Sequence, residues 1–363
     1  MVKNLEFMEI PRVVIFGPGA ISNVSKVVSK FTGSRSIVVV SGGVNTSKIA
    51  SDKVLPLLVS DYNVEFLRIG SMPCIDATKL FYDKLRKNKD IGLLLGVGGG
   101  KVLDVTKTLA FLLGVEYVSI PTSAANDGIA SPSLSYLLKV DFEKTFGRPI
   151  SMAKAPIAVL ADTEIISKAP YITLQAGCGD LLAKFVAVRD WELAYKLKGE
   201  DYSEYAASMA LMSAELIVRK AAVIKVGGEE GARIVVKALI GSGVAMSIAG
   251  SSRPASGSEH LFSHALDLLS RKYGFKPAPH GLQCGVGAIM MMWLHGGDWE
   301  RIRNVLRKIG APTTARGLGI DSKYIIKALT MAHQIRPSRY TILGESGLTK
   351  EAAERLAKET GVI

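Results

Sequence analysis

Short β-branched segments alternate with amphipathic segments through about residue 161, and this alternation limits the possible folds more than any other feature. Five segments have the composition of buried strands, at 12–17, 36–42, 64–70, 91–100 and 116–123. Helical patterns lie between them, at 21–31, 51–62, 76–88 and 101–114. Such alternation is typical of βαβ units, in which a parallel sheet carries helices on both faces and binds ligands at the carboxyl ends of its strands. The sequence therefore predicts a Rossmann-like α/β domain first.

The pattern changes after Asp162, where long helical segments replace the strands. These segments lie at 171–197, 203–224, 229–250 and 298–310. Just before the change, residues 131–162 are expected to form a hairpin-like excursion that ends in one more strand at 156–162. A chain of 363 residues exceeds the size at which one core stops growing, about 250–300 residues. We therefore expect an α/β domain at 1–163, an all-helical domain at 164–363, and a ligand cleft between them.

The net charge of +12 favours an anionic partner. Lys and Arg are scattered along helical and turn segments, without the interleaved aromatic residues of a nucleic-acid platform. Solvated helix faces explain them better, so no nucleic-acid partner is expected, although a basic nucleic-acid-binding protein remains the alternative from another class. The chain starts without a signal-peptide pattern and lacks an apolar run of bilayer length, which indicates a cytoplasmic protein without stable membrane insertion.

Three cysteines, Cys74, Cys178 and Cys284, are an odd number without CxxC spacing. This usage suits a reducing compartment and argues against a disulfide framework or a thiolate zinc site. Each cysteine is expected to be a small apolar core residue.

A glycine run follows the fourth expected strand, in "LLLGVGGGKVLD" at 93–104. Gly98–Gly100 would allow close approach of the backbone to a ligand and left-handed conformations, and the following helix start would bind a diphosphate. Lys101 could add charge, and Asp104 could cap or orient the loop. Glycine-rich turns between a strand and a helix also occur for packing reasons alone, without a bound phosphate. The acidic residue that would select NAD is missing after the second strand, so NAD and NADP both remain open.

Polar side chains crowd the loop "SIPTSAANDGIASPSLSY" at 119–136. The hydroxyls of Thr122, Ser123 and Ser131 could contact a cofactor. Asn126 and Asp127 suit a polyhydroxy substrate, but an Asx-turn that satisfies their own backbone explains them equally well.

Four residues in the helical half could form a metal site. His260 and His264 are four residues apart and share a helix face, Asp180 lies in "GCGDLLAK", and His280 stands at an expected helix start after a proline. A catalytic zinc takes three nitrogen or oxygen ligands from the protein. Spacing alone leaves core or capping roles for these histidines open. His295 and His333 have no other candidate metal ligand near them in the sequence.

Five motifs together resemble one family. They are "GVGGGKVLDVTK", "PTSAANDGIASPS", "GCGDLLAK", "SSRPASGSEHLFSH" and "PHGLQCGVG". In this order, over nearly the whole chain, they resemble the archaeal glycerol-1-phosphate dehydrogenases, within the iron- or zinc-dependent alcohol dehydrogenase and dehydroquinate synthase-like superfamily. The resemblance implies a dehydroquinate synthase-like fold, with a dinucleotide-binding first domain and a metal- and substrate-binding second domain.

The resemblance also assigns residues. It implies zinc ligation by Asp180, His260 and His280, substrate contact by Asp127, Asp180 and His264, and catalytic roles for Asp127 and His264. Cofactor contacts are implied for Gly98, Gly99, Gly100, Lys101, Val102, Asp104, Thr122, Ser123, Ala124, Ala125 and Ser131.

The implied reaction reduces dihydroxyacetone phosphate to sn-glycerol 1-phosphate with NADH or NADPH, for archaeal membrane lipids, in a homo-oligomer. Lys184 stands where this branch often carries an uncharged residue, and with Arg253 it is the candidate for binding the substrate phosphate. A glycerol dehydrogenase or a dehydroquinate synthase-like enzyme remains the alternative.

Overall fold

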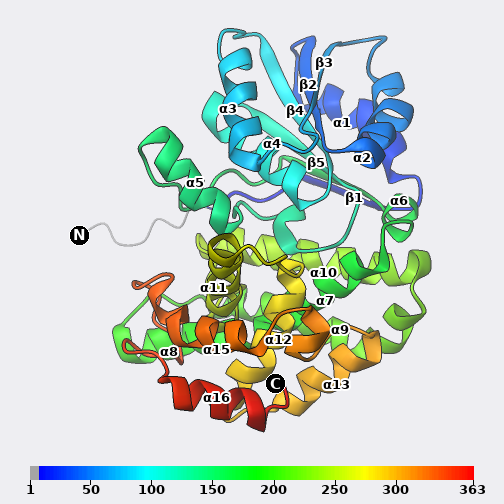
Figure 1. Ribbon diagram of the computed structural model, residues 1–363. Coiled ribbons are helices and arrows are strands. Elements are labelled where there is room, and N and C mark those ends of the chain that lie inside the picture. The colour runs from blue at the N-terminus through cyan, green and yellow to red at the C-terminus, as the bar shows by residue number, and fades with distance from the viewer. Residues whose placement is uncertain (1–7) are drawn as a thin grey trace. The chain divides into compact units, whose positions relative to one another are not determined.

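The computed structural model describes residues 8–363 and divides into two compact units (Figure 1). The first unit comprises the described part of residues 1–169 together with residues 228–248, and the second comprises residues 170–227 and 249–363. Residues 228–248, which lie beyond the boundary expected at residue 163, are thus part of the first unit.

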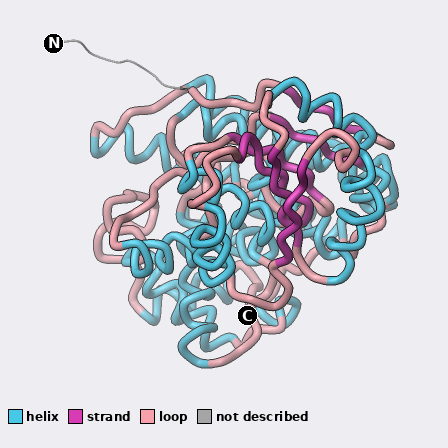
Figure 2. Tube along the Cα trace, turned by 90° about the horizontal axis from the view of Figure 1, so that it is seen from above, coloured by secondary structure: helices cyan, strands magenta, loops and turns pink. Residues whose placement is uncertain are grey.

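The first unit is built on a six-stranded sheet, whose strands are gathered in magenta in Figure 2. Every strand pair is parallel, and the strand order is β1-β6-β5-β4-β2-β3. The predicted parallel α/β domain is confirmed. All six predicted strands are present, as β1 (Val13–Gly17), β2 (Ser36–Ser41), β3 (Asn63–Arg68), β4 (Ile91–Gly98), β5 (Glu116–Pro121) and β6 (Ala158–Asp162).

Both faces of this sheet are covered by helices. Ile37 and Val39 of β2 pack with α1 (Val24–Phe31), whereas the alternate residues Val38 and Val40 pack on the opposite face. This alternation follows from the two-residue period of side chains in a strand. The opposite face carries α3 (Cys74–Leu85) and α4 (Gly100–Leu113).

The prediction of an amphipathic α-helix at 51–62 is wrong, because other kinds of helical turn form there. After α2 (Val44–Ile49), the chain forms a π-helical turn (η2, Ala50–Val54) and a 3-10 turn (η3, Leu55–Leu57). Pro56 explains the break, because proline has no backbone N–H and clashes with the preceding turn of an α-helix.

The hairpin predicted within residues 131–162 is also wrong, since α5 (Tyr136–Phe146) occupies its centre. Leu138 and Phe142 are buried and Phe146 packs with them, a spacing of four that matches a helix rather than a strand. The rings of Phe142 and Phe146 lie 4.6 Å apart between centroids. The helix therefore forms a small apolar cluster of its own.

Three short elements and one long helix complete the first unit. The short ones are η1 (Ala20–Asn23), η4 (Asp127–Ile129) and α6 (Thr163–Ser167). The long helix, α10 (Gly228–Ala249), has the length and apolar composition of a membrane span and is the one such helix in residues 8–363, but 56% of its most apolar window is buried. It approaches the η4 loop closely, because a Cβ atom at Gly243 would lie 2.8 Å from the backbone nitrogen of Ser131.

The second unit is helical throughout, as predicted. Its longer helices are α7 (Tyr171–Leu182), α8 (Lys184–Lys198), α9 (Glu204–Val226), α11 (Ser258–Tyr273), α12 (His280–Leu294), α13 (Trp299–Ile309), α15 (Ser322–Met331) and α16 (Lys350–Glu359). The short α14 (Ala315–Leu318) and η5 (Ala332–Gln334) link the last of these. Residues 281–292 of α12 are buried on all sides, as expected for the central helix of a core.

Candidate functional site

Glycines allow α7 and α12 to cross with their backbones in contact. A Cβ atom at Gly179 would lie 2.2 Å from the carbonyl oxygen of Gly281, and one at Gly281 would lie 2.0 Å from the carbonyl oxygen of Ala176. Real Cβ atoms do not approach so closely, so neither position accepts a larger residue without a backbone shift. This crossing brings Asp180, next to Gly179, toward the first turn of α12.

Four side chains from three helices meet at this crossing. Asp180 comes from α7, His260 from α11, and His280 and Cys284 from α12, and one ligand atom from each lies within 4.8 Å of all the others. Asp180 and Cys284 are fully buried, and His260 is nearly so. We call these four residues the donor cluster. It contains the carboxylate and both histidines that the sequence assigned to zinc, together with one cysteine that it did not.

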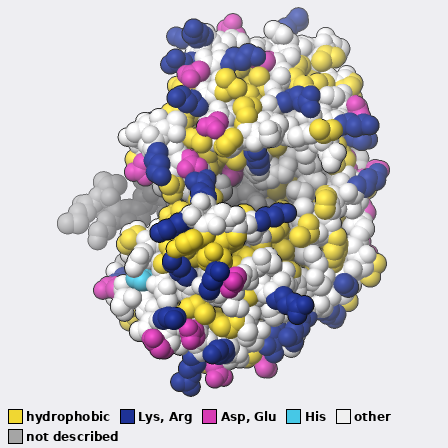
Figure 3. Space-filling view, in the orientation of Figure 1, with side chains coloured by type: hydrophobic (Ala, Val, Ile, Leu, Met, Phe, Trp, Pro, Cys, Tyr) yellow, Lys and Arg dark blue, Asp and Glu magenta, His cyan; other side chains and the backbone are white. Residues whose placement is uncertain are grey.

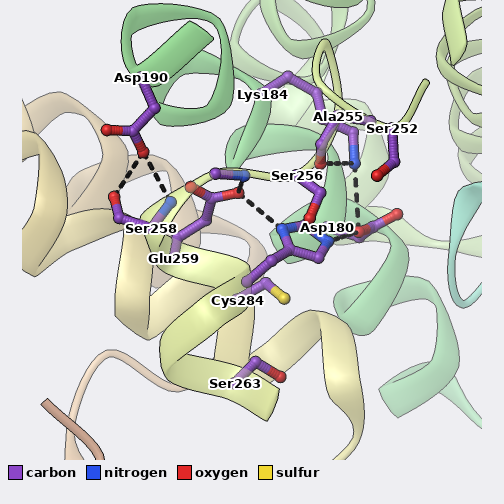
Figure 4. A network of polar contacts seen from close by, with 12 residues as sticks. Asp180, Lys184, Asp190, Ser252, Ala255, Ser256, Ser258, Glu259, Ser263 and Cys284 are labelled. Carbon is purple, nitrogen blue, oxygen red and sulfur yellow. Dashed lines mark hydrogen bonds and ion pairs between the residues drawn. The ribbon is translucent and has the colours of Figure 1, made fainter. Parts of the chain in front are cut away.

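Hydrogen bonds on the far side of each imidazole fix how the rings face the donor cluster. Glu259 Oε1 lies 2.6 Å from Nδ1 of His260, the contact drawn in Figure 4, and Ser263 Oγ lies 2.9 Å from Nδ1 of His280. Nε2 of each ring is then the nitrogen directed at the cluster. Histidines that bind metals are usually held in this way by a carboxylate, carbonyl or hydroxyl partner. The residues therefore fit a divalent metal such as zinc in both donor type and orientation.

Charge keeps the Asp180 carboxylate ionised despite its burial. Lys184 Nζ lies 3.2 Å from Asp180 Oδ1 and 3.2 Å from the carbonyl oxygen of Ala255, both contacts drawn in Figure 4. Burial alone would raise the pKa of Asp180, but the Lys184 charge and the hydrogen bond with His260 outweigh it and hold the pKa below its ordinary value. An ionised carboxylate is the form that binds a metal.

Charges and hydrogen bonds within the cluster shift the pKa values of its histidine and cysteine side chains. Burial acts to lower the pKa of His260, but the charge of Cys284 and hydrogen bonds with Asp180, Cys284 and Glu259 raise it well above the ordinary value. Burial acts to raise the pKa of Cys284, but His260 and His280 lower it. Because metal ligands must be deprotonated, binding at this cluster should release protons.

Replacing Glu259 by glutamine is expected to weaken zinc binding about 10- to 100-fold, the usual cost of losing an outer-shell partner. Glu259 acts here as a positioning residue, since Oε1 accepts from the Gly257 backbone N–H at 2.8 Å and faces His260. Glutamine keeps an acceptor oxygen but removes the charge. Zinc titration against a competing chelator measures the change, and Glu192→Gln on the exposed side of α8 is the control. An unchanged affinity for Glu259→Gln would contradict this role.

His264 lies one helical turn beyond His260 but belongs to a different group of side chains. Its ring stacks on that of His280, with centroids 5.5 Å apart, and it forms a second possible ligand group with Asp267 and His280. Gln283 Nε2 donates to Asp267 at 3.1 Å. The two histidines of the helix pair therefore have different surroundings.

The start of α11, which carries His260, is tied to a buried carboxylate. Both the backbone N–H and the hydroxyl of Ser258 donate to Asp190 Oδ2 at 2.6 Å, as Figure 4 shows. The other oxygen, Oδ1, accepts from the Ile342 backbone N–H at 2.7 Å and lies 3.0 Å from His295 Nε2. Asp190, which lies on α8, thus connects the start of α11, the end of α12 and the segment around Ile342. His295, for which the sequence suggested no role, is part of this hydrogen-bonded network.

The predicted cofactor loop lies at the end of β4 in the first unit. Gly98 ends the strand, Gly99 precedes α4, and Gly100 begins it. The left-handed conformations expected here are absent, since none of these glycines has a positive φ. Gly98 instead makes room for a neighbour, because a Cβ atom there would lie 2.4 Å from Val102 Cγ2. Its requirement for glycine is therefore one of packing.

The first turn of α4 remains suited to an anion. Gly99 at the N-cap has no side chain, so no side-chain cap occupies the first N–H groups of the helix. Lys101 is exposed in this turn. Asp104 contacts a different loop from the glycine loop considered for it, because its Oδ2 accepts from the backbone N–H of Ser135 at 3.1 Å. Lys107, fully buried, donates to the carbonyl oxygens of Gly128 and Ser133 and so braces the same loop.

The loop after β5 contains the Asx-turn considered for it, at one of the two residues named. Asn126 forms the Asx-turn, since its Oδ1 accepts from the Gly128 backbone N–H at 3.0 Å. Asp127 does not; its Oδ2 accepts from the hydroxyl of Ser242 in α10 at 2.8 Å. Thr122 is buried and its backbone N–H donates to the carbonyl oxygen of Gly98, whereas Ser123 and Ala125 are half-buried and Ala124 is buried. The Ser131 hydroxyl is buried and has no protein partner among the described residues.

The basic residues considered for phosphate binding are engaged elsewhere. Arg253 is nearly buried and pairs with Glu200, and its Nη1 also donates to the carbonyl oxygen of Tyr340. Lys184 contacts Asp180, as described above. On the face shown in Figure 3, Lys and Arg side chains are spread among acidic and apolar ones.

Sequence reasoning missed three features of the donor cluster. Glu259 was unassigned, Ser263 was not considered, and Cys284 was expected to be an apolar core residue. The spacing of Cys284, four residues after His280, was the one available signal, because it puts both on the same face of α12.

Comparisons with known proteins agree along the whole chain. Residues 15–170 match the family described as iron-containing alcohol dehydrogenase. The NAD(P)+ glycerol-1-phosphate dehydrogenase of Methanothermobacter thermautotrophicus is 50% identical over 98% of this chain and 99% of its own length. The enzyme of the same name from Korarchaeum cryptofilum is 61% identical over 77% of this chain and 88% of its own length.

The fold is also found in solved structures. A probable glycerol dehydrogenase from Sinorhizobium meliloti aligns with a TM-score of 0.77 at 19% identity, over 99% of this chain and 100% of its own. An iron-containing alcohol dehydrogenase aligns with a TM-score of 0.70 at 16% identity, over 99% of this chain and 100% of its own. At this level of identity the likeness shows a common fold.

Proposed function

Because the chain belongs to the family of NAD(P)+ glycerol-1-phosphate dehydrogenases, we propose that it reduces dihydroxyacetone phosphate to sn-glycerol 1-phosphate with NADH or NADPH. The observation that carries the proposal is the convergence of Asp180, His260 and His280 in a chain about half identical to enzymes of that name. Deep burial and a carboxylate-held imidazole suit a catalytic metal rather than an ordinary core.

In this proposal Asp180, His260 and His280 hold zinc. The ion would act as a Lewis acid that polarises the ketone of the substrate. Asp180 brings the negative charge that partly compensates the cation, and Lys184 keeps that carboxylate ionised and oriented. Glu259 holds the imidazole of His260 in the orientation that directs Nε2 inward.

The first unit would bind the nicotinamide cofactor. Gly98, Gly99, Gly100 and the first turn of α4 are assigned to the diphosphate, with Lys101 adding positive charge and Asp104 holding the adjacent loop. Further contacts are proposed for Val102, Thr122, Ser123, Ala124, Ala125 and Ser131. The buried hydroxyl of Ser131 supports its inclusion, since such a group needs a partner.

Asp127 and His264 are the proposed catalytic residues that act on the substrate. Asp127 lies on a braced loop, held by the Ser242 hydroxyl, and would accept hydrogen bonds from a substrate hydroxyl. His264 is placed beside His280 and would contact a substrate hydroxyl or supply the proton that completes the alcohol, directly or through water. The boundary between the cofactor domain and the metal domain is proposed at residue 163.

The direct test is cofactor oxidation by the purified zinc-loaded protein. NADH or NADPH should be consumed with dihydroxyacetone phosphate, and little with dihydroxyacetone. Turnover of dihydroxyacetone without turnover of the phosphate ester would replace this proposal by a glycerol dehydrogenase. Activity with both cofactors is expected, because no acidic residue selects NAD after β2.

Replacing His264 by alanine is expected to leave zinc bound and to reduce kcat roughly 100- to 10,000-fold, the range of a general acid-base group. The ring lies outside the donor cluster that is proposed to hold the metal, so zinc should bind without it. Zinc content and steady-state kinetics on the same preparation separate the two effects. Loss of zinc from His264→Ala would instead identify His264 as a ligand.

The proposed product is the glycerol phosphate of archaeal membrane lipids, made by a cytoplasmic homo-oligomer. A net charge of +12 would help to attract the dianionic substrate.

A further inference from the structure

Cys284 lies close to the ligand atoms of three other residues. Its Sγ is 3.5 Å from Nε2 of His280 and 3.8 Å from Nδ1 of the same ring. It is within 4.8 Å of the ligand atoms of Asp180 and His260 as well, and the side chain is fully buried. Figure 4 shows the sulfur between Ser263 and the loop that carries Ser256.

The position of Cys284 is fixed by the helix that carries His280. The two residues are one turn apart on α12, whose next turns are packed on all sides, and glycines hold α12 against α7. The sulfur therefore cannot leave the cluster by a movement of its helix.

We infer that Cys284 is a fourth protein ligand of the metal, together with Asp180, His260 and His280. This inference rests on the proposed metal centre but not on the identity of the substrate. The thiol would lose its proton to solvent when the Zn–S bond forms. The protein would then supply one sulfur, two nitrogen and one oxygen donor, and the substrate ketone would add as a further ligand, since zinc in catalytic sites can accept five.

A sulfur ligand would bias the choice of metal. Thiolates favour zinc and other softer ions, whereas carboxylate and water ligands suit manganese and magnesium. In a superfamily described by its iron-containing members, Cys284 would shift this chain toward zinc. The three-ligand set without Cys284 would discriminate less between zinc and manganese.

X-ray absorption at the zinc edge tests the inference on the wild-type full-length protein loaded with zinc and no substrate. We expect one sulfur neighbour at about 2.3 Å beside nitrogen and oxygen neighbours at about 2.0–2.2 Å. A zinc site with nitrogen and oxygen neighbours alone would overturn the role of Cys284 and leave the metal centre intact. Failure to bind zinc would overturn the metal centre itself, and dihydroxyacetone phosphate turnover would then be judged separately.

A pair of matched variants identifies the sulfur. Cys284→Ala should lose the sulfur signal and bind zinc at least tenfold more weakly, with a smaller loss of affinity for manganese. Cys178→Ala, which changes an equally buried cysteine of α7 outside the cluster, should keep both the signal and the affinity. A sulfur signal that persists in Cys284→Ala, or equal losses for zinc and manganese, would refute the assignment. If Cys284→Ala does not fold, the wild-type spectrum alone decides.

Discussion

Replacing His260 by alanine is expected to remove bound zinc and enzyme activity together. His260 belongs to the donor cluster, with Glu259 on one ring nitrogen and Asp180 Oδ1 3.4 Å from the other. The substitution removes one of the donors of the cluster together with the Glu259 contact that orients it, so zinc affinity should fall steeply even though Asp180, His280 and Cys284 remain. A Lewis acid contributes several kcal/mol to catalysis, so kcat/KM should fall roughly a thousandfold or more.

The measurement is zinc content by elemental analysis together with NADH oxidation on dihydroxyacetone phosphate. His333→Ala is the matched control, since His333 lies outside both possible ligand groups of the described residues. The control should retain zinc and activity. An active, zinc-free His260→Ala protein would refute the proposed metal centre, and circular dichroism distinguishes loss of the metal from loss of the fold.

The second large effect is expected from Asp190→Ala, which should destabilise the protein by about 3–5 kcal/mol, the usual cost of breaking a buried charged network. The fully buried carboxylate accepts hydrogen bonds from Ser258 and Ile342 and faces His295. Alanine would leave several buried donors without an acceptor, each at a cost of about 1–3 kcal/mol before relaxation. The start of α11 would lose its attachment, so zinc affinity should fall as well.

Chemical denaturation with a helix-sensitive probe measures this change. Asp201→Ala, which removes an exposed carboxylate soon after the same helix, should have little effect. A loss below about 1 kcal/mol for Asp190→Ala would mean that water or a rearranged side chain replaces the carboxylate.

The strands of the first unit could be predicted because each is a short apolar run between turn residues. Their alternation with helices also fixed the parallel sheet, since parallel strands require crossovers. The helix α5 was not predicted, although Leu138 and Phe142 have the four-residue spacing of a helix face. Pro56 breaks a pattern that is otherwise helical.

The donor cluster could be predicted only in part. Residue types and spacing pointed to His260, but they could not separate its surroundings from those of His264, because helix periodicity puts both on one face. That separation depends on which helices pack against α11. Asp190 and Ser258 are also far apart in sequence, so their contact could be known only from the tertiary structure. Motif resemblance, rather than periodicity, singled out Asp180.

The return of the chain to the first unit at residue 228 affects the order in which the protein can fold during synthesis. The hydroxyl of Ser242, which holds Asp127, lies on α10 and leaves the ribosome only after residues 170–227 of the other unit. The nascent first unit, although its sheet is complete at β6, therefore lacks one of the contacts that hold the η4 loop, while those of Lys107 and Asn126 are already available. Fragments that end near residue 169 should accordingly form the sheet but hold this loop poorly, and the first unit is not an independent module that could be transferred by a single cut.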